Sequence, residues 1–221
     1  MTNIKKVTLP NYTRKEEQLN SASHAAGTII GIIVIIIGFI FCQTCVSLFG
    51  TLTFAASIIA LYTCSAVYHG LRKESKFKQI MRLVDHGMIY VLITGSSIGL
   101  MSNLIFESAP VYFYAIGITQ VVLSLIGLAS IFINFEKFKV LQMVLYMLVG
   151  WLSIVLMYPI YKYCDNCFYP LFLCFGGGAV YTLGMIFYAK GAKVRYSHSI
   201  FHFFVLGGTI MHVGAMCTAF M

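Results

Sequence analysis

The chain has 221 residues, of which 59% are hydrophobic and only 10% are charged. Soluble domains are about 45–50% apolar and about 25% charged, so this composition excludes a soluble globular domain and a disordered chain. The net charge of +8 does not indicate a nucleic-acid-binding protein, because the basic residues form short clusters between apolar runs. The composition therefore predicts an all-α integral membrane protein.

Seven apolar runs along the chain are long enough to cross a bilayer, which takes about 20 residues per helix. The first two share a stretch without charged residues that extends to Arg72, and the polar residues 42–45 separate them. The expected spans are residues 25–41, 50–70, 83–105, 111–132, 140–160, 168–189 and 197–220. Such continuous runs exclude an outer-membrane barrel, whose strands alternate polar and apolar residues. The sequence thus predicts a seven-transmembrane helix bundle, residues 25–221.

The distribution of basic residues predicts the orientation of the bundle. Fourteen of the fifteen Lys and Arg residues precede the first span or follow spans two, four and six, whereas Lys162 alone lies on the other side. Because cytoplasmic loops carry the excess of Lys and Arg, we expect a cytoplasmic N-terminus and an outer C-terminus in the plasma membrane. Residues 1–24 are then a cytoplasmic N-terminal segment, and we expect Met1 to about Glu17 to be a flexible or surface-lying tail.

Ionisable side chains inside a membrane span are costly and therefore indicate function. Asp85, at the start of the third span, is the only acidic residue within an expected span. Five of the six histidines fall in the same cytoplasmic half of the bilayer, namely His24, His69, His86, His198 and His202. Spans two, three and seven carry four of these histidines into one layer although they are distant in sequence. We therefore expect a polar cluster there.

The spacing of three of these histidines is typical of a metal site. His198 and His202 are four residues apart, on one helical face, where two imidazoles can reach one ion. A third imidazole from His69 would complete a three-histidine set with one open position, as in catalytic zinc sites. Asp85 would then orient a ligand or accept a hydrogen bond from the bound water. The alternative is that these histidines only pack between helices, bonded to backbone or serine groups.

Two further histidines, His86 and His212, fit this cluster less well. His86 follows Asp85 directly and is therefore turned by about 100° around the helix, so the two side chains cannot point the same way. We do not expect His86 to be a ligand. His212 lies ten residues after His202, which places it about 15 Å deeper in the membrane. We expect it to be a packed, hydrogen-bonded core residue.

Two further patterns fall outside the histidine layer. Cys42/Cys45 and Cys164/Cys167 are two Cys-x-x-Cys pairs on the expected outer side. They could be ordinary membrane-facing or loop cysteines, a disulfide within or between the pairs, or a second metal site. The three glycines 176–178 lie mid-membrane without a following Lys-Ser or Lys-Thr, so they indicate close helix packing rather than a phosphate-binding loop.

Four motifs carry a resemblance to a known family. In chain order they are Glu17-x-x-Asn20-x-x-Ser23-His24-x-x-Gly27, Ser65-x-x-x-His69, Asp85-His86-x-x-Ile89-Tyr90 and Ser197-His198-x-x-Phe201-His202-x-Phe204-Val205-Leu206-x-Gly208-x-x-x-His212. With these motifs the chain resembles the hemolysin III family, within the wider progestin and adipoQ receptor group that includes the adiponectin receptors. Ser23 stands where many members have threonine, and both residues carry a hydroxyl group.

The resemblance implies seven helices with the N-terminus inside and a Zn²⁺ ion bound by His69, His198 and His202. It also implies that Asp85 and Ser65 lie around the water at that ion. Three functions are compatible with these residues. The first is a zinc-dependent, ceramidase-like hydrolase of a lipid amide or ester, with Asp85 as general base. The second is a sensor or homeostasis factor for membrane lipid, in which zinc is mainly structural.

The third function is a pore-forming cytolysin, which the family name indicates. The outer half of the membrane region has few polar residues, and this disfavours a wide pore. A retinal-type pump is excluded because it needs a lysine in the last helix, and residues 197–220 contain none.

Overall fold

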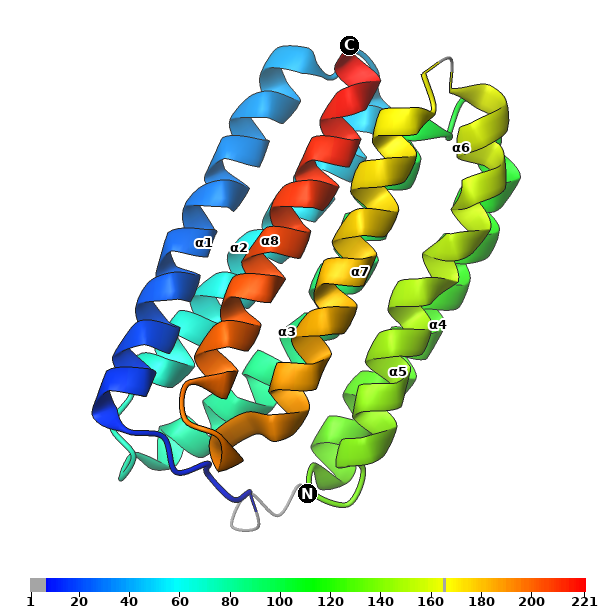
Figure 1. Cartoon of the computed structure of the whole chain (residues 1–221). Helices are drawn as coiled ribbons and strands as arrows, with labels where there is room; N and C mark the ends of the chain where they lie inside the picture. Colours follow the sequence, from blue (N-terminus) through cyan, green and yellow to red (C-terminus); the bar gives the residue numbers. More distant parts are fainter. Residues whose placement is uncertain (1–6, 165) are drawn as a thin grey trace.

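The structure, a computed structural model, describes residues 7–164 and 166–221, and these residues form a helical bundle without β-strands. Within the described residues, seven helical segments are long and apolar enough to cross a membrane. Helix α1 begins at one end of the bundle and α8 ends at the other (Figure 1). The seven-transmembrane helix class predicted from the sequence is therefore confirmed, and the protein is a multi-pass membrane protein.

Each expected span corresponds to one helical segment, although the first three begin earlier than expected and the fifth is broken. Six spans are single helices, which are α1 (Arg14–Phe41), α2 (Cys45–Gly70), α3 (Lys76–Leu104), α4 (Pro110–Asn134), α7 (Phe168–Lys190) and α8 (Ser197–Cys217). The fifth span is broken into α5 (Lys139–Trp151), a 3₁₀ segment (Leu152–Leu156) and α6 (Met157–Tyr163). Helix α1 begins at Arg14 rather than at residue 25, so it extends beyond its apolar run.

The early start of α1 has a local cause. The hydroxyl of Thr13 accepts a hydrogen bond from the backbone N–H of Glu16 at 3.3 Å, and the Glu16 carboxylate accepts one from the backbone N–H of Thr13 at 2.8 Å. This reciprocal capping box satisfies two backbone donors that a helix N-terminus otherwise leaves free. Glu16 also accepts the N–H of Tyr196, which precedes α8, at 2.7 Å.

The N-terminal segment was expected to be a flexible or surface-lying tail as far as about Glu17. Residues 8–13 form no helix and are exposed or partly exposed, so this part does lie on the surface. Val7 is buried among Leu83, Ile131 and Phe135, so this apolar side chain anchors the segment against α3 and α4. Residues 14–17 are not part of a tail, because they form the first turn of α1. Residues 1–6 lie outside the described part of the chain.

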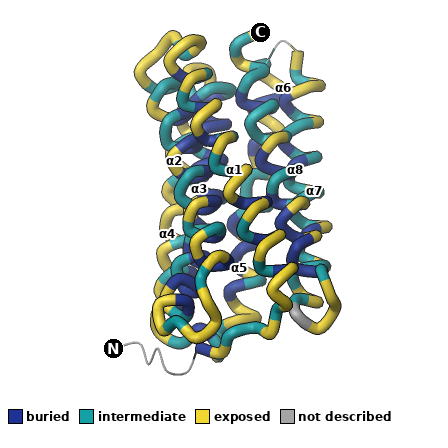
Figure 2. The backbone as a smooth tube through the Cα atoms, turned by 90° about the vertical axis from the view of Figure 1, so that its left-hand side faces the viewer, coloured by how far each residue is buried: buried dark blue, intermediate teal, exposed yellow. Residues whose placement is uncertain are grey.

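The bundle presents apolar side chains both inward and outward. Phe54, Ile58 and Tyr62 on α2 are fully buried and form the centre of the core. Ile36 and Phe39 on α1 are among the many large apolar side chains that are exposed. Buried residues line the interior of the bundle and exposed ones follow the outward faces of the helices (Figure 2). Outward apolar faces are what a lipid bilayer requires, because it is itself an apolar solvent.

Helix α7 packs closely on α8 and only lightly on α5. A Cβ atom at Gly177 would lie 2.5 Å from the His212 ring and 3.1 Å from the Gly208 carbonyl oxygen. A Cβ atom at Gly178 would meet no atom within 4 Å. The expectation of close helix packing is thus confirmed at Gly177, whereas Gly178 faces open space. Nε2 of His212 lies 3.0 Å from the carbonyl oxygen of Cys174, so His212 is the packed core residue that we expected.

The cysteine pairs form no disulfide. Cys42 and Cys45 carry free thiols, as does Cys167. The Cys42 sulfur lies 3.3 Å from the hydroxyl of Thr51, and the Cys164 thiol donates to the carbonyl oxygen of Leu104 at 3.6 Å. Among the described residues, no cysteine belongs to a cluster that could hold a metal ion. The pairs are therefore ordinary cysteines at helix ends.

The two adjacent glycines provide a matched test of the α7–α8 contact. Gly177→Ala should destabilise the protein by about 1–3 kcal/mol, because the His212 ring cannot move away from the added methyl group. Gly178→Ala should be neutral or stabilise the helix by about 0.5–1 kcal/mol, since alanine has the better helix propensity. Denaturant unfolding in detergent measures both. Equal stabilities of the two variants would contradict the described packing.

Candidate metal centre

Three histidines meet at the end of the bundle where α1 begins. His69 lies at the end of α2, and His198 and His202 lie in the first two turns of α8. All three side chains are buried, and one ring nitrogen of each lies within 4.8 Å of those of the other two. The tertiary structure therefore brings together the three residues that the sequence predicts as ligands, and this group could hold a metal ion.

The Nε2 atoms of the three rings are the ones available to a metal. Nε2 of His198 lies 3.1 Å from Nε2 of His202. Nε2 of His69 is buried and has no hydrogen-bond partner in the described part of the chain. A buried polar atom without a partner is costly unless something else satisfies it. A cation between the rings would satisfy all three nitrogens.

Hydrogen bonds to the opposite nitrogens leave the Nε2 lone pairs free. Nδ1 of His69 lies 2.6 Å from the Glu17 carboxylate, and Nδ1 of His202 lies 3.2 Å from the carbonyl oxygen of Asn20. Both acceptors require a proton on Nδ1, so a neutral ring carries its lone pair on Nε2. Metal-binding histidines typically donate their other N–H to a carboxylate or carbonyl group in this way. The donor set thus fits a metal ion.

Helix α1 supplies most of these supporting groups. Glu17 and Asn20 are three residues apart, and Ser23 follows, so the first turns of α1 present a polar face to α2 and α8. The hydroxyl of Ser23 lies 3.3 Å from Nδ1 of His202. The hydroxyl of Ser199 donates to the side-chain oxygen of Asn20 at 2.5 Å. The N-terminal part of α1 therefore forms hydrogen bonds with both α2 and α8, the helices that carry the three histidines.

Glu17 also ties α3 to the centre. Its second oxygen forms a 2.7 Å ion pair with Lys78, a lysine whose side chain is only 2% exposed. Lys78 additionally donates to the carbonyl oxygen of Leu71, at 2.8 Å. A buried ammonium group needs a counter-ion and full hydrogen bonding, and the Glu17 carboxylate supplies the charge. One carboxylate thus joins His69 on α2 to Lys78 on α3.

Glu17, Asn20 and His24 belong to the first of the four motifs, but the sequence alone assigns none of them a role in the centre. The signal that could have found them is their spacing of three and four residues, which places them on one helical face. The His24 ring stacks on the His202 ring, with centroids 3.6 Å apart and planes 13° apart. Neither nitrogen of His24 has a hydrogen-bond partner among the described residues.

Asp85 and Ser65 lie beside the histidine cluster but are not members of it. The hydroxyl of Ser65, one helical turn before His69, interacts with the Asp85 carboxyl group, and the positive charge of Arg82 also acts on that group. His86 is not a member of the cluster either, and its Nδ1 lies 2.8 Å from the carbonyl oxygen of Arg82 and 3.6 Å from the Asp85 carboxylate. The described residues therefore offer the cluster three histidine ligands and no carboxylate as a fourth.

A segment before α1, which we call the strap (residues 7–13), covers the end of the cluster. The ring of Tyr12 stacks on that of His198, with centroids 5.0 Å apart and planes 19° apart. The hydroxyl of Thr8 donates to Glu136 at 2.7 Å, and Arg82 donates to the same oxygen at 3.2 Å. Burial raises the pKa of Glu136, but the hydrogen bonds from Thr8 and the charge of Arg82 leave this pKa below its ordinary value. The charged carboxylate therefore holds the strap in place.

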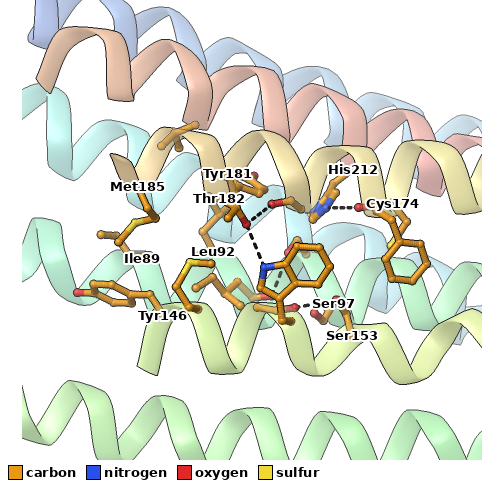
Figure 3. Close-up of a pocket in the computed structure, with 18 of the residues that line it drawn as sticks. Ile89, Leu92, Ser97, Tyr146, Ser153, Cys174, Tyr181, Thr182, Met185 and His212 are labelled. Atoms are coloured by element: carbon orange, nitrogen blue, oxygen red, sulfur yellow. Dashed lines mark hydrogen bonds between the residues drawn. The ribbon is translucent and has the colours of Figure 1, made fainter. Parts of the chain in front are cut away.

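An apolar cavity adjoins the cluster from inside the bundle. It lies between α3, α5, α7 and α8 and has an empty volume of about 980 Å³, including its open side (Figure 3). Tyr188 and Phe201 line the end nearest the histidines, and their rings lie 6.4 and 5.6 Å from the ring of His198. Cys174 and His212 line the far end. The centre is thus closed by the strap on one side and borders apolar space on the other.

These observations define a class, a multi-pass membrane protein whose buried histidine triad could hold a metal ion. Residues 12–213 match a family model described as Haemolysin-III related. The chain is 30% identical over 205 residues to "Hemolysin-3 homolog" of Bacillus subtilis (strain 168), covering 90% of this chain and 91% of that protein. It is 29% identical over 200 residues to "Hemolysin-3" of Bacillus cereus, covering 89% and 88%.

The chain therefore belongs to the hemolysin III family. The family membership that its four motifs indicate is confirmed.

The role of Glu17 can be tested against its neighbour. Glu17→Gln should weaken metal binding by about 10–100-fold, because the charged acceptor that orients His69 is lost. Glu16→Gln is the matched control, since Glu16 caps α1 and touches none of the three histidines. Competition with a chelator on purified protein measures the affinity. The same affinity in both variants would show that Glu17 does not support the centre.

Proposed function

We propose that this protein is a zinc-binding membrane protein that acts in membrane lipid sensing or homeostasis by hydrolysing a lipid amide or ester. One observation carries the proposal. Three buried histidines direct Nε2 atoms at one point, and no carboxylate among the described residues completes the set. Zinc sites with three protein ligands are of the catalytic kind, whereas four protein ligands are typical of structural sites.

His69, His198 and His202 are the proposed zinc ligands. Imidazole nitrogens suit zinc among the common biological metals, and the buried position excludes competing ligands from solution. When bound there, zinc would polarise a carbonyl group and make water a stronger nucleophile near neutral pH. Glu17 and Asn20 keep the ligand rings in the tautomer and orientation that such an ion needs.

Asp85 is the proposed general base, and Ser65 positions it. Hydrolysis needs a group that takes a proton from the attacking water and returns it to the leaving amine or alcohol. Asp85 is not paired with any of the three proposed ligands, and its carboxylate lies 3.6 Å from Nδ1 of His86. The Ser65 hydroxyl forms a hydrogen bond with its carboxyl group, which fixes the orientation of that group.

The surroundings of the centre favour a lipid as substrate. The adjoining cavity is lined mainly by apolar side chains, among them Leu92, Ile93 and Met185. Such a lining suits a hydrocarbon chain and excludes water from the reacting groups. The strap with Tyr12 covers the opposite side of the triad. We propose that a lipid in this cavity presents its carbonyl group to the histidines past Tyr188 and Phe201, which form the end of the cavity nearest the triad.

We further propose that α1 begins on the cytoplasmic side of the plasma membrane, as the basic residues indicate. Labelling of single cysteines should find a cysteine placed near the start of α1 accessible only from the cytoplasm. A cysteine placed next to Lys162 should be accessible only from outside. The reverse pattern would refute this orientation and the placement of the histidines in the inner leaflet.

The catalytic roles can be separated from the binding roles by two variants. Asp85→Asn should keep the zinc, because the three histidines remain, yet lower the turnover of labelled lipid amides or esters by about 10²–10⁴-fold. His202→Ala should lose both zinc and turnover. Glu107→Gln is the control, because this exposed acid lies far from the histidines in the loop before α4. Metal analysis and lipid chromatography measure the two properties.

If Asp85→Asn leaves the lipid composition of the membrane unchanged while His202→Ala alters it, zinc is structural and the protein is a lipid sensor. This second candidate is favoured by the way Glu17 and Asn20 link the histidine-bearing helices. A pore-forming cytolysin is the third, suggested by the names of the two relatives. The apolar cavity disfavours a water-filled pore, and release of dye from liposomes would test that activity directly.

A further inference from the structure

The single tryptophan of the chain, Trp151, forms a bridge across the cavity wall. It is the last residue of α5, and its indole N–H donates to the hydroxyl of Thr182 on α7 at 3.0 Å. The Thr182 hydroxyl in turn donates to the carbonyl oxygen of Gly178 at 2.8 Å. The indole is therefore fixed in orientation between two helices that otherwise make little contact. Thr182 and the residues around it face the cavity in Figure 3.

This bridge lies partway along the cavity. The lining residues on α7 run from Tyr188, near the histidines, to Cys174 at the other end. Fourteen helical residues rise about 21 Å, which is close to the length of an extended palmitoyl chain. Thr182 lies six residues from Tyr188, or about 9 Å along the axis. A chain that starts at the histidines therefore has to pass the indole to reach the far end.

Two glycines in the cavity wall are not required by helix packing. A Cβ atom at Gly150 on α5, or at Gly178 on α7, would meet no atom within 4 Å. Both residues line the cavity, and Gly178 lies one turn beyond Thr182. Glycine weakens a helix interior relative to alanine, so its presence without a close neighbour is unfavourable for the helix itself. The space that Gly178 leaves open belongs to the cavity beyond the bridge, whereas Gly150 directly precedes Trp151 and leaves the wall open at the level of the bridge.

We propose that two features of the cavity wall determine the length of acyl chain that the cavity accepts. One is Trp151, which is hydrogen-bonded to Thr182, and the other is the absence of side chains at Gly150 and Gly178. This inference rests on the proposed function, since it requires a lipid whose carbonyl end lies at the histidines. The middle of the chain passes the indole face beside Gly150, and the part beyond the indole passes Gly178 toward Cys174. Long acyl chains fit because no side chain fills that space.

The first experiment uses the wild-type protein, in which all tryptophan fluorescence comes from Trp151. The probes are palmitic acids that carry bromine, a contact quencher, either near the carboxyl group or in the middle of the chain. We expect strong quenching by the mid-chain bromine and weak quenching by the bromine near the carboxyl group. Bound probe, verified by mass spectrometry, with equal quenching from both positions would overturn the inference.

The second experiment fills the space beyond the bridge. Gly178→Leu should lower the affinity for palmitic acid by at least about tenfold and leave that for octanoic acid within about twofold. Gly117→Leu is the matched control, because a Cβ atom there makes only an ordinary contact at 3.8 Å with Met101 on another face of the bundle. Both variants replace a helical glycine by a strong helix former, so we expect both to fold.

A third variant, Thr182→Val, is nearly isosteric and removes the acceptor of the indole N–H. It should change the extent to which the mid-chain bromine quenches Trp151, and it should broaden the range of acyl-chain lengths that bind. The same loss of palmitic acid affinity in Gly178→Leu and Gly117→Leu would overturn the inference while leaving the lipid function intact. Failure of every fatty acid to bind the wild-type protein would overturn the proposed lipid function, and this inference with it.

Discussion

The Glu17 carboxylate is the group on which the centre depends. One of its oxygens accepts the Nδ1 proton of His69 and the other pairs with the buried Lys78, so a single side chain of α1 joins α2 and α3. Each of these groups would be costly alone in an apolar environment. Together they form a satisfied network, and the orientation of His69 toward the α8 histidines follows from it. The capped N-terminus of α1 matters for the same reason, because it places Glu17 on a rigid helix.

The two sides of the histidine cluster are different chemical environments. The strap closes one side with the Tyr12 ring and is held by the hydrogen bonds that link Thr8 and Arg82 to Glu136. The other side borders the apolar cavity between α3 and α7. Polar groups that orient the histidines thus come mainly from α1, whereas the space for a ligand lies between α3, α5, α7 and α8. Such a division suits chemistry on a lipid, in which a polar carbonyl group is joined to a long hydrocarbon chain.

Glycine has two opposite uses in the same helix. Gly177 lets α7 approach α8 until a methyl group would strike the His212 ring, and this contact contributes to the stability of the bundle. Gly178, the next residue, faces the cavity, and its missing side chain leaves volume instead of allowing contact. The break in the fifth span after Trp151 belongs to the same region, because it ends α5 where the indole reaches Thr182. Two adjacent residues of α7 therefore have different roles. Gly177 determines the packing of α7 against α8, and Gly178 determines the shape of the cavity.

The sequence by itself determined the seven spans, because about 20 consecutive apolar residues are required by the thickness of the bilayer and need no tertiary contact. It also indicated His69, His198 and His202, since residues four apart on a helix share a face and the motifs add the third ring. Only the tertiary structure decided that Glu17 orients His69, that His24 stacks on His202 and that Tyr12 covers His198. The cavity and its Trp151 bridge were likewise invisible in the sequence. Each of these features joins side chains from separate helices, and local polarity or periodicity carries no information about which distant side chains will meet.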